Sequence, residues 1–359
     1  MNINNNAILR DNYWDNIKGF LIILVVFGHF LYYLTYFSLN NNVVNALYMF
    51  HMEAFVFVSG FFSKSEHSKS FHPLFNLAVS FIILQFGFVF YGIFFMHQNP
   101  SPVVPLCTSW YILALIIWRI TVSHLAKIKF IIGFLFILSI LSLFCQDINI
   151  QFGMNKVIFY YPFFMSGYLL KPEKIKIIKD VSVIKKYIIS TAMLVITVCL
   201  GILLYNTFNI TKADLIQDII ENCNINHIFA RISIYIISFL MIIFMLFFFN
   251  DKKLPFLTNI GKNSFSLYLV HCPFTLAFTY FAINYTNDIQ IILSILFTVL
   301  LCIVFGADII NNLIKKILDN FYYAATGEQE IKYPLLYQVL ILFMIIFIFI
   351  MPFLMNKIT

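Results

Sequence analysis

Apolar stretches close to 20 residues long recur along this 359-residue chain and constrain its fold more than any other feature. Such a stretch crosses the hydrocarbon core of a bilayer as an α-helix. Of the residues, 61% are hydrophobic and 11% charged, whereas soluble domains carry about 25% charged residues. Only helices and closed barrels satisfy their backbone in lipid, and the short alternating strands of a barrel are absent from the sequence. The sequence therefore predicts an all-α fold, a polytopic bundle of transmembrane helices.

We expect about 11 spans, a ten-helix core followed by a C-terminal helix. The first apolar stretch is too long for a signal peptide and lacks a small-residue cleavage site, so we interpret it as an uncleaved first span. The predicted spans cover residues 17–37, 43–62, 71–96, 107–125, 130–145, 157–170, 187–205, 228–249, 264–285, 289–310 and 334–355.

The positive-inside rule orients this map. With a cytoplasmic N-terminus, 18 of the 23 Lys and Arg residues fall on the cytoplasmic side, six of them in the loop 171–186. Only Lys156, Lys212 and Lys357 fall on the outer side, and Arg119 and Arg231 fall within spans. The net charge of +7 therefore indicates topology and contact with anionic lipid, and we expect no nucleic-acid partner.

One ionisable side chain, His29, falls deep inside the first span. Ionisable groups at such depth are costly and usually line a pathway or an active site. A helical rise of about 1.5 Å per residue puts His29 roughly 16 Å beyond Lys18, near the bilayer midplane. Their spacing is close to three helical turns, so both lie on one face, with Asp15 within about 40° of it. Histidine suits a general base near pH 7, and the alternative is a core histidine bonded to a neighbouring helix.

Glu53 lies about 15 Å deep in the second span, at the same depth as His29. A carboxylate beside an imidazole holds its tautomer and stabilises the imidazolium. His51 lies roughly 200° around the helix from Glu53, so both cannot face one cavity unless the helix is broken. We therefore favour Glu53 as the partner of His29, with a purely structural pair as the alternative.

Two further spans carry polar side chains. Arg119 lies in the inner half of the fourth span, where it either snorkels to the inner headgroups or binds phosphates of a cytoplasmic donor. In the ninth span Ser264, Tyr268, His271 and Thr275 share one helical face. Such a stripe should face the bundle interior, although hydrogen bonding between helices alone would also explain it.

Other common site types find no support in the sequence. It contains no metal-binding and no phosphate-loop motif, and we expect no metal ion. The six cysteines show no disulfide framework, which favours scattered structural thiols. No repeat or appended domain interrupts the chain. We expect one membrane domain over residues 1–359, with a core at about 10–310 and a C-terminal segment 311–359.

The run RDNYWDNIKGFLIILVVFGH resembles the opening helix of the acyltransferase 3 family of integral-membrane acyltransferases. Within that family the chain looks nearest to the fucose 4-O-acetylases and capsular-polysaccharide O-acetyltransferases. The resemblance covers about residues 10–310. Further blocks that agree in order are FHMEAFVFVSGFF (50–62), SWYILALIIWR (109–119), FYYPFFMSGYLLK (159–171) and SLYLVHCPF (266–274).

This resemblance implies transfer of an acyl group, usually acetyl, from cytoplasmic acetyl-CoA to a hydroxyl of a cell-surface or lipid-linked polysaccharide. His29 matches the essential first-helix histidine and would act as general base or acetyl relay. The implied setting is a multi-pass protein of the plasma membrane. With the residues derived above, the candidate catalytic set is His29, Glu53, His271 and Tyr268, and the candidate donor-binding set is Arg10, Asp15, Lys18, Arg119 and Lys64.

The sequence also departs from the family pattern. Glu53 stands where relatives often have proline, and the stretch after the second span offers Lys64, Lys69 and His72 in place of arginines. A transporter or exporter of a glycan or small solute through the same polar cavity is the alternative function, and a non-catalytic scaffold is a third. The expected partners are acetyl-CoA, a glycan acceptor and the lipid bilayer, and a homodimer stays open.

Overall fold

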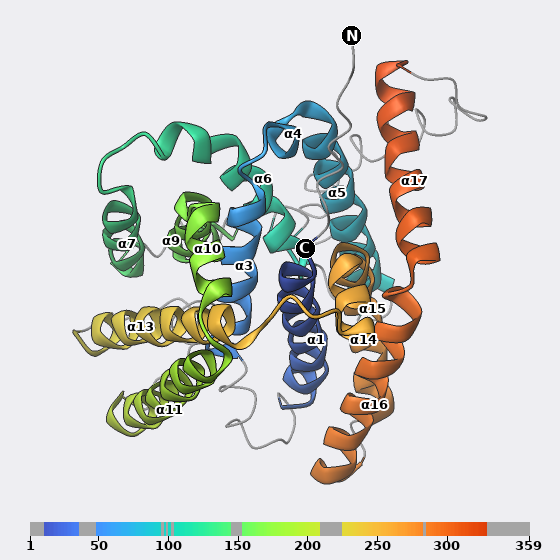
Figure 1. Cartoon of the computed structure of the whole chain (residues 1–359). Helices are drawn as coiled ribbons and strands as arrows, with labels where there is room; N and C mark the ends of the chain where they lie inside the picture. The colour runs from blue at the N-terminus through green and yellow to red at the C-terminus, as the bar shows by residue number, and fades with distance from the viewer. Residues whose placement is uncertain are drawn as a thin grey trace.

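The computed structural model describes residues 11–35, 48–94, 97, 100–101, 104–144, 153–208, 225–282 and 285–328, and every regular element in these ranges is helical (Figure 1). The expected all-α fold is therefore confirmed over the part of the chain that is described. The last predicted span, 334–355, and Arg10 lie outside it.

Most predicted spans coincide with a helix. These helices are α1 (Asn12–Thr35), α3 (His51–Phe62), α5 (Phe71–Phe94), α6 (Ser109–Leu125), α7 (Ile131–Leu141), α9 (Met154–Leu169), α11 (Val183–Phe208), α13 (Ile225–Phe248), α15 (Ser264–Ala282) and α16 (Asn287–Phe305). Shorter or more polar elements lie between and after them: α4 (Glu66–Lys69), the 3-10 turn η1 (Ser142–Phe144), α10 (Pro172–Asp180), α14 (Pro255–Lys262) and α17 (Asp308–Thr326).

Five stretches in the described chain are long and apolar enough to cross a membrane unaided: Asn12–Leu31, Phe71–Phe94, Val183–Leu203, Ile225–Phe248 and Asp288–Phe305. The helices α3, α6, α7 with its following 3-10 turn, and α15 are apolar but shorter. The structure is therefore that of a membrane helical bundle. The count of 11 spans and the cytoplasmic N-terminus stay predictions.

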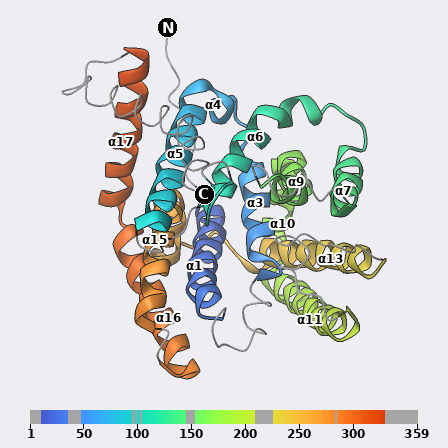
Figure 2. The same cartoon turned by 180° about the vertical axis from the view of Figure 1, so that it is seen from behind.

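Helix α1 lies at the centre of the molecule. It packs against α3 on one side and against α14, α15 and α16 on the other, as both views show (Figures 1 and 2). Its apolar side chains Ile17, Leu21, Val25 and Phe30 are almost fully buried. Because His29 belongs to this helix, the packing of α1 carries the candidate base into the middle of the bundle.

Helices α3 and α9 cross with their backbones in contact. A Cβ atom added to Gly60 of α3 would collide with the carbonyl of Phe164, and one added to Gly167 of α9 would collide with the carbonyl of Phe57. Small residues at helix crossings permit close packing in membranes, where burial in lipid offers no hydrophobic gain. This crossing fixes the position of α3 next to α1.

The edge of the bundle formed by α11 and α13 is apolar and exposed. Helices α11 and α13 pack against each other, at the left of Figure 1, and most of α11 faces outward. Exposed side chains on α11 include Ile184, Ile188 and Leu203. A continuous apolar surface of this kind is too extensive for water and is what lipid tails would cover.

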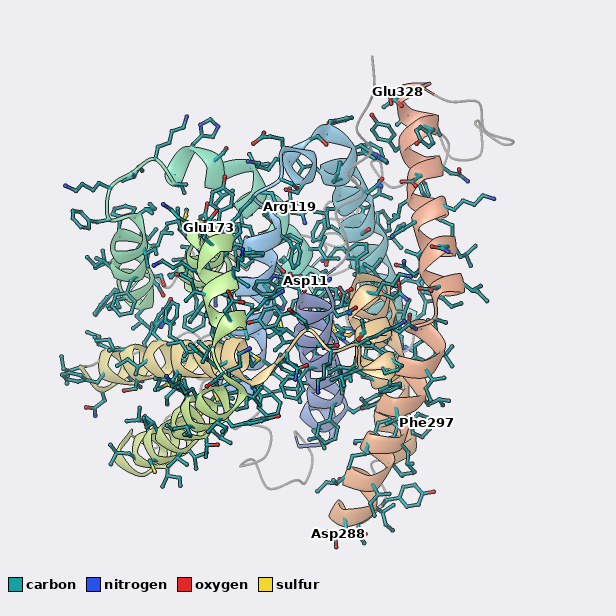
Figure 3. The ribbon with its side chains drawn as sticks, in the orientation of Figure 1. Asp11, Arg119, Glu173, Asp288, Phe297 and Glu328 are labelled. Carbon is teal, nitrogen blue, oxygen red and sulfur yellow. A yellow bond between two sulfur atoms is a disulfide. The ribbon has the colours of Figure 1, made fainter. Side chains whose placement is uncertain are left out.

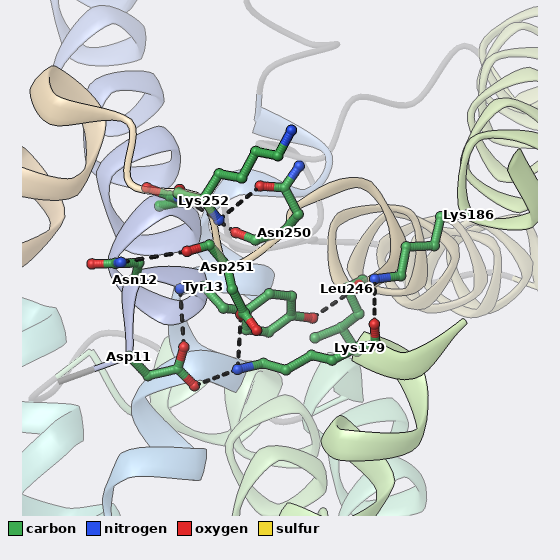
Figure 4. Close-up of polar contacts among 10 residues, drawn as sticks. Asp11, Asn12, Tyr13, Lys179, Lys186, Leu246, Asn250, Asp251 and Lys252 are labelled. Carbon is green, nitrogen blue, oxygen red and sulfur yellow. Dashed lines mark hydrogen bonds and ion pairs between the residues drawn. The ribbon is translucent and has the colours of Figure 1, made fainter. Parts of the chain in front are cut away.

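Charged side chains hold the polar helix α10 to the start of α1 (Figure 4). Lys179 Nζ lies 2.6 Å from Asp11 Oδ2 and 2.9 Å from Asp251 Oδ1. Partial burial opposes the charged ammonium, but the hydrogen bonds from Lys179 to both carboxylates raise its pKa above the ordinary value. Tyr13 adds a hydrogen bond of 2.6 Å from its hydroxyl to the Leu246 carbonyl. Three segments far apart in sequence therefore meet at the first turn of α1.

Helix α17 bridges the starts of α5 and α15. At its first turn Asp308 accepts a hydrogen bond from Asn263 Nδ2 at 2.8 Å and pairs with Lys262 at 3.0 Å. Nearer its end, Asp319 Oδ1 lies 2.9 Å from His72 Nε2. Because α5 and α15 both begin on the predicted cytoplasmic side, α17 would lie along that side.

Replacing Gly167 by Ala is expected to destabilise the bundle by about 1–3 kcal/mol, because the new methyl group must push α3 and α9 apart. The matched control is Gly87→Ala on α5, where an added Cβ meets nothing within 4 Å and the helix gains propensity. The measurement is the thermal midpoint of the detergent-purified protein. Equal midpoints for the two variants would show that the close crossing is not formed.

Candidate functional site

The imidazole of His29 is bonded to its own helix. Its Nδ1 lies 2.8 Å from the Val25 carbonyl oxygen one turn earlier, and the side chain is half-buried. A carbonyl can only accept, so the neutral ring donates from Nδ1–H and carries its lone pair on Nε2. A lone pair on an accessible ring nitrogen is what a general base or a nucleophile needs.

A second imidazole lies beside the first. The ring centroids of His29 and His271 are 5.0 Å apart. His271 Nδ1 lies 2.8 Å from the Tyr268 carbonyl oxygen, so this ring takes the same tautomer as His29. Its Nε2 is buried and has no hydrogen-bond partner among the described residues. The two helices α1 and α15 thus bring together two neutral imidazoles that are anchored in the same way.

The polar stripe of α15 faces the interior, as the sequence predicted. Ser264, Tyr268, His271 and Thr275 are all buried. The Tyr268 hydroxyl donates to the Thr108 carbonyl oxygen at 2.5 Å, so its proton is already engaged. Of the two candidate partners from this helix, His271 is therefore the one whose ring lies against His29.

A disulfide joins this region to the segment before α6. Cys107 and Cys272 are bonded although 165 positions separate them, and Cys272 directly follows His271. The expectation of scattered thiols is wrong for this pair. Periodicity could not reveal the pairing because it depends on the segment before α6 lying against α15. Cys199 and Cys302 are free, while Cys145 and Cys223 lie outside the described residues.

Tyr48 covers His29 from the side of α3. Its ring centroid lies 6.3 Å from that of His29 and 4.9 Å from that of His51. A Cβ on Gly28 would come within 3.3 Å of the Tyr48 ring, so glycine at this position leaves room for the tyrosine. The small residue before His29 therefore serves the packing of its aromatic neighbour.

Glu53 is fully buried in α3, and its charge acts on the phenols of Tyr160 and Tyr235. The rings nearest to His29 are instead those of His271 and Tyr48. Pairing of Glu53 with His29 stays a prediction. Both His51 and Glu53 are buried because α3 is enclosed on nearly every face.

Sequence reasoning missed Lys156 as a cation whose charge acts on His29. It stands in the first turn of α9, and its Nζ lies 5.5 Å from the ring centroid of Trp110. Its positive charge acts on His29. A signal was present in the sequence, because a lysine on the outer side runs against the positive-inside pattern.

A group of cations gathers at the other end of α3, near its turn into α4. Lys18 pairs with the buried Asp15 at 2.7 Å, and its Nζ lies 5.0 Å from the ring centroid of Phe62. Lys64 donates to the Leu170 carbonyl oxygen. The pKa of Lys64 is lowered by burial, and the carboxylate of Glu173 opposes that shift.

Arg119 of α6 reaches the same turn. Its Nε donates to Ser63 Oγ at 3.3 Å and its Nη1 to the Ser68 carbonyl at 3.4 Å. Arg119 and Glu173 lie above the start of α1 in Figure 3. The structure thus brings together four of the five expected donor-binding residues, which are Asp15, Lys18, Lys64 and Arg119. Across the described residues, no group of three or more His, Cys, Asp or Glu could hold a metal ion.

Comparison with known proteins gives two matches. A family model described as an acyltransferase domain, that of the acyltransferase 3 family, matches residues 11–307. Nodulation protein NolL of Sinorhizobium fredii (strain NBRC 101917 / NGR234) is 45% identical over 56 residues. That match spans 14% of this chain and 15% of the length of NolL. No solved structure matches the chain significantly.

Proposed function

This chain belongs to the acyltransferase 3 family and is a membrane acyltransferase, and from this premise we propose that it acetylates a glycan. The donor is cytoplasmic acetyl-CoA. The acceptor is a hydroxyl of a cell-surface or lipid-linked polysaccharide, and the protein works in the plasma membrane. Its kinship with fucose 4-O-acetylases and capsular-polysaccharide O-acetyltransferases is part of this proposal.

The observation that carries the proposal is the state of His29. Its Nδ1–H is bonded to Val25, the lone pair of its Nε2 is left for substrate, and the side chain is half-buried at the centre of the bundle. A base placed there meets a thioester arriving from one side of the membrane and an alcohol arriving from the other. Neither substrate has to cross.

The reaction needs one proton transfer in each direction. His29 Nε2 takes the proton of the acceptor hydroxyl while the hydroxyl oxygen attacks the thioester carbonyl carbon. The tetrahedral intermediate collapses, the carbon–sulfur bond breaks, and the proton passes from Nε2 to the departing sulfur. General-base help of this kind contributes about 10²–10⁴-fold in rate. In the relay variant, Nε2 itself attacks the thioester and passes the acetyl group to the hydroxyl.

The neighbours of His29 have distinct roles in this scheme. His271, neutral and with its lone pair on Nε2, would stabilise the proton that His29 takes up, because its Nε2 can accept a hydrogen bond from the imidazolium. Tyr268 positions α15 through its hydrogen bond to Thr108 rather than touching the reacting atoms. Glu53 would stabilise the positive charge that forms in the cluster, acting through the buried tyrosines around it.

The donor would bind at the cations near the turn between α3 and α4. Lys18, Lys64 and Arg119 present positive charge at one place, and the phosphates of CoA are strong acceptors for such groups. Asp15 holds Lys18 in place. Arg10, outside the described residues, is proposed as a further cation for the donor. The acetyl end of the donor would then point along α1 towards His29.

His29→Ala is expected to abolish acetyl transfer, with a loss of at least about 10²-fold, because the variant lacks the base that takes the hydroxyl proton. The matched control is His124→Ala, an exposed histidine at the end of α6. Transfer is measured as radiolabelled acetyl incorporated into glycan by purified protein. Normal transfer by the His29 variant at equal protein level would end the proposal and favour a transporter.

Lys64→Ala is expected to raise the KM for acetyl-CoA about tenfold, the effect of losing one charge-assisted contact to a phosphate. The KM for acetyl-pantetheine, which lacks those phosphates, should not change. Lys127→Ala, an exposed lysine of the α6–α7 turn, is the control. An equal rise for both donors would remove Lys64 from the phosphate site.

A further inference from the structure

Lys156 is held in an unusual position for a lysine at the edge of a membrane. It follows the left-handed Gly153 that starts α9, and its Nζ lies 5.5 Å from the ring centroid of Trp110. A lysine at a helix end ordinarily extends towards headgroups and water. Here the ammonium is turned over an aromatic face, and its charge reaches His29.

The aromatic support under Lys156 is rigid. Trp110 stacks on Tyr160 with ring centroids 5.0 Å apart, and the two rings come from α6 and α9. Tyr160 is itself buried. The ammonium group is therefore placed by packing and needs little reordering to receive a ligand, as expected of a preorganised binding group.

Within the described residues, no carboxylate forms an ion pair with Lys156. The nearby Glu53 acts on Tyr160 and Tyr235 instead. The other cation of this region, Arg231, donates to the Ser139 carbonyl and to Ser142 Oγ. Among the described residues, Lys156 is thus a cation left for a ligand, and its charge acts on His29.

The charge of Lys156 has a cost for the proposed chemistry. His29 must become an imidazolium during each transfer, and a neighbouring positive charge opposes that step. A negative group bound at Lys156 would remove the opposition when the acceptor arrives. His29 would therefore accept the proton most readily when the acceptor is anionic.

We infer that Lys156 binds an anionic oxygen group of the acceptor, a carboxylate or a phosphate, and so holds a neighbouring hydroxyl at His29. This inference rests on the proposed function and adds the class of acceptor to it. The glycan would contain either acidic sugars or phosphate groups. Both offer oxygen atoms that accept charge-assisted hydrogen bonds from an ammonium.

The experiment uses full-length protein in nanodiscs, radiolabelled acetyl-CoA and surface glycan from a strain that lacks this gene. One portion of the glycan is left native, one has its carboxylates converted to neutral amides, and one has its phosphates removed with hydrofluoric acid. Initial rates give kcat and KM for each acceptor. The treatment that weakens binding identifies the anionic group.

For the wild-type protein, one of the two treatments should raise the KM of the glycan at least tenfold. Lys156→Gln should raise the KM for native glycan by a similar factor and leave the KM for the neutralised glycan within about twofold. Lys156→Arg should restore most of the binding. Lys171→Gln, an exposed lysine between α9 and α10, is the matched control and should behave as wild type.

Two outcomes would overturn the inference. One is a wild-type KM that neither treatment changes. The other is a Lys156→Gln variant that loses kcat equally for native and neutralised glycan, which would assign the lysine to the reaction's oxyanion or to the fold. Wild-type protein that acetylates none of the three glycans would instead contradict the proposed function.

Discussion

The proposed chemistry depends on one hydrogen bond inside a helix, in which the imidazole of His29 donates to the carbonyl of Val25. Within the bundle a histidine needs a partner for its N–H, and the preceding turn of α1 supplies it without any acidic residue. This bond selects the tautomer and turns Nε2 away from the helix. The same kind of hydrogen bond occurs at His271, so the two neighbouring rings carry their lone pairs on the same ring nitrogen.

Such a site is useful only if α1 cannot shift against its neighbours. Its position is set by contacts between backbones, because a Cβ on Gly19 or Gly261 would collide with the carbonyls of α14 and α1. The α3–α9 crossing follows the same rule through Gly60 and Gly167. At the first turn of α1, Lys179 forms ion pairs with the carboxylates of Asp11 and Asp251 (Figure 4). Lipid provides little drive to press helices together, so close packing and hydrogen bonding fix the geometry.

The sequence predicted the features that depend on local period. Helices over most of the predicted spans and the shared face of Tyr268 and His271 follow from the helical period of about 100° per residue, and the fold agrees with them. The depth of His29 in the bilayer stays a prediction. The sequence could not show which residue contacts His29. It gives the position of a residue along its helix, but it does not give the rotation of each helix about its axis. The sequence favours Glu53 on depth, whereas the contact of His271 with His29 depends on how α1 and α15 face each other. The Cys107–Cys272 bond and the turn of Lys156 over Trp110 required the arrangement of distant segments.

Charge repulsion limits how many protons His29 and His271 can bind at one time. Two imidazoles with centroids 5.0 Å apart resist a second proton once the first is bound, and Lys156 adds a further positive charge. The pair therefore carries at most one extra proton, and that proton must leave with the thiol before another acceptor can be activated. Proton uptake and release are thus tied to a single turnover. An anion delivered by the acceptor lowers the barrier to uptake and departs with the product, which couples recognition of the correct glycan to the basicity of His29.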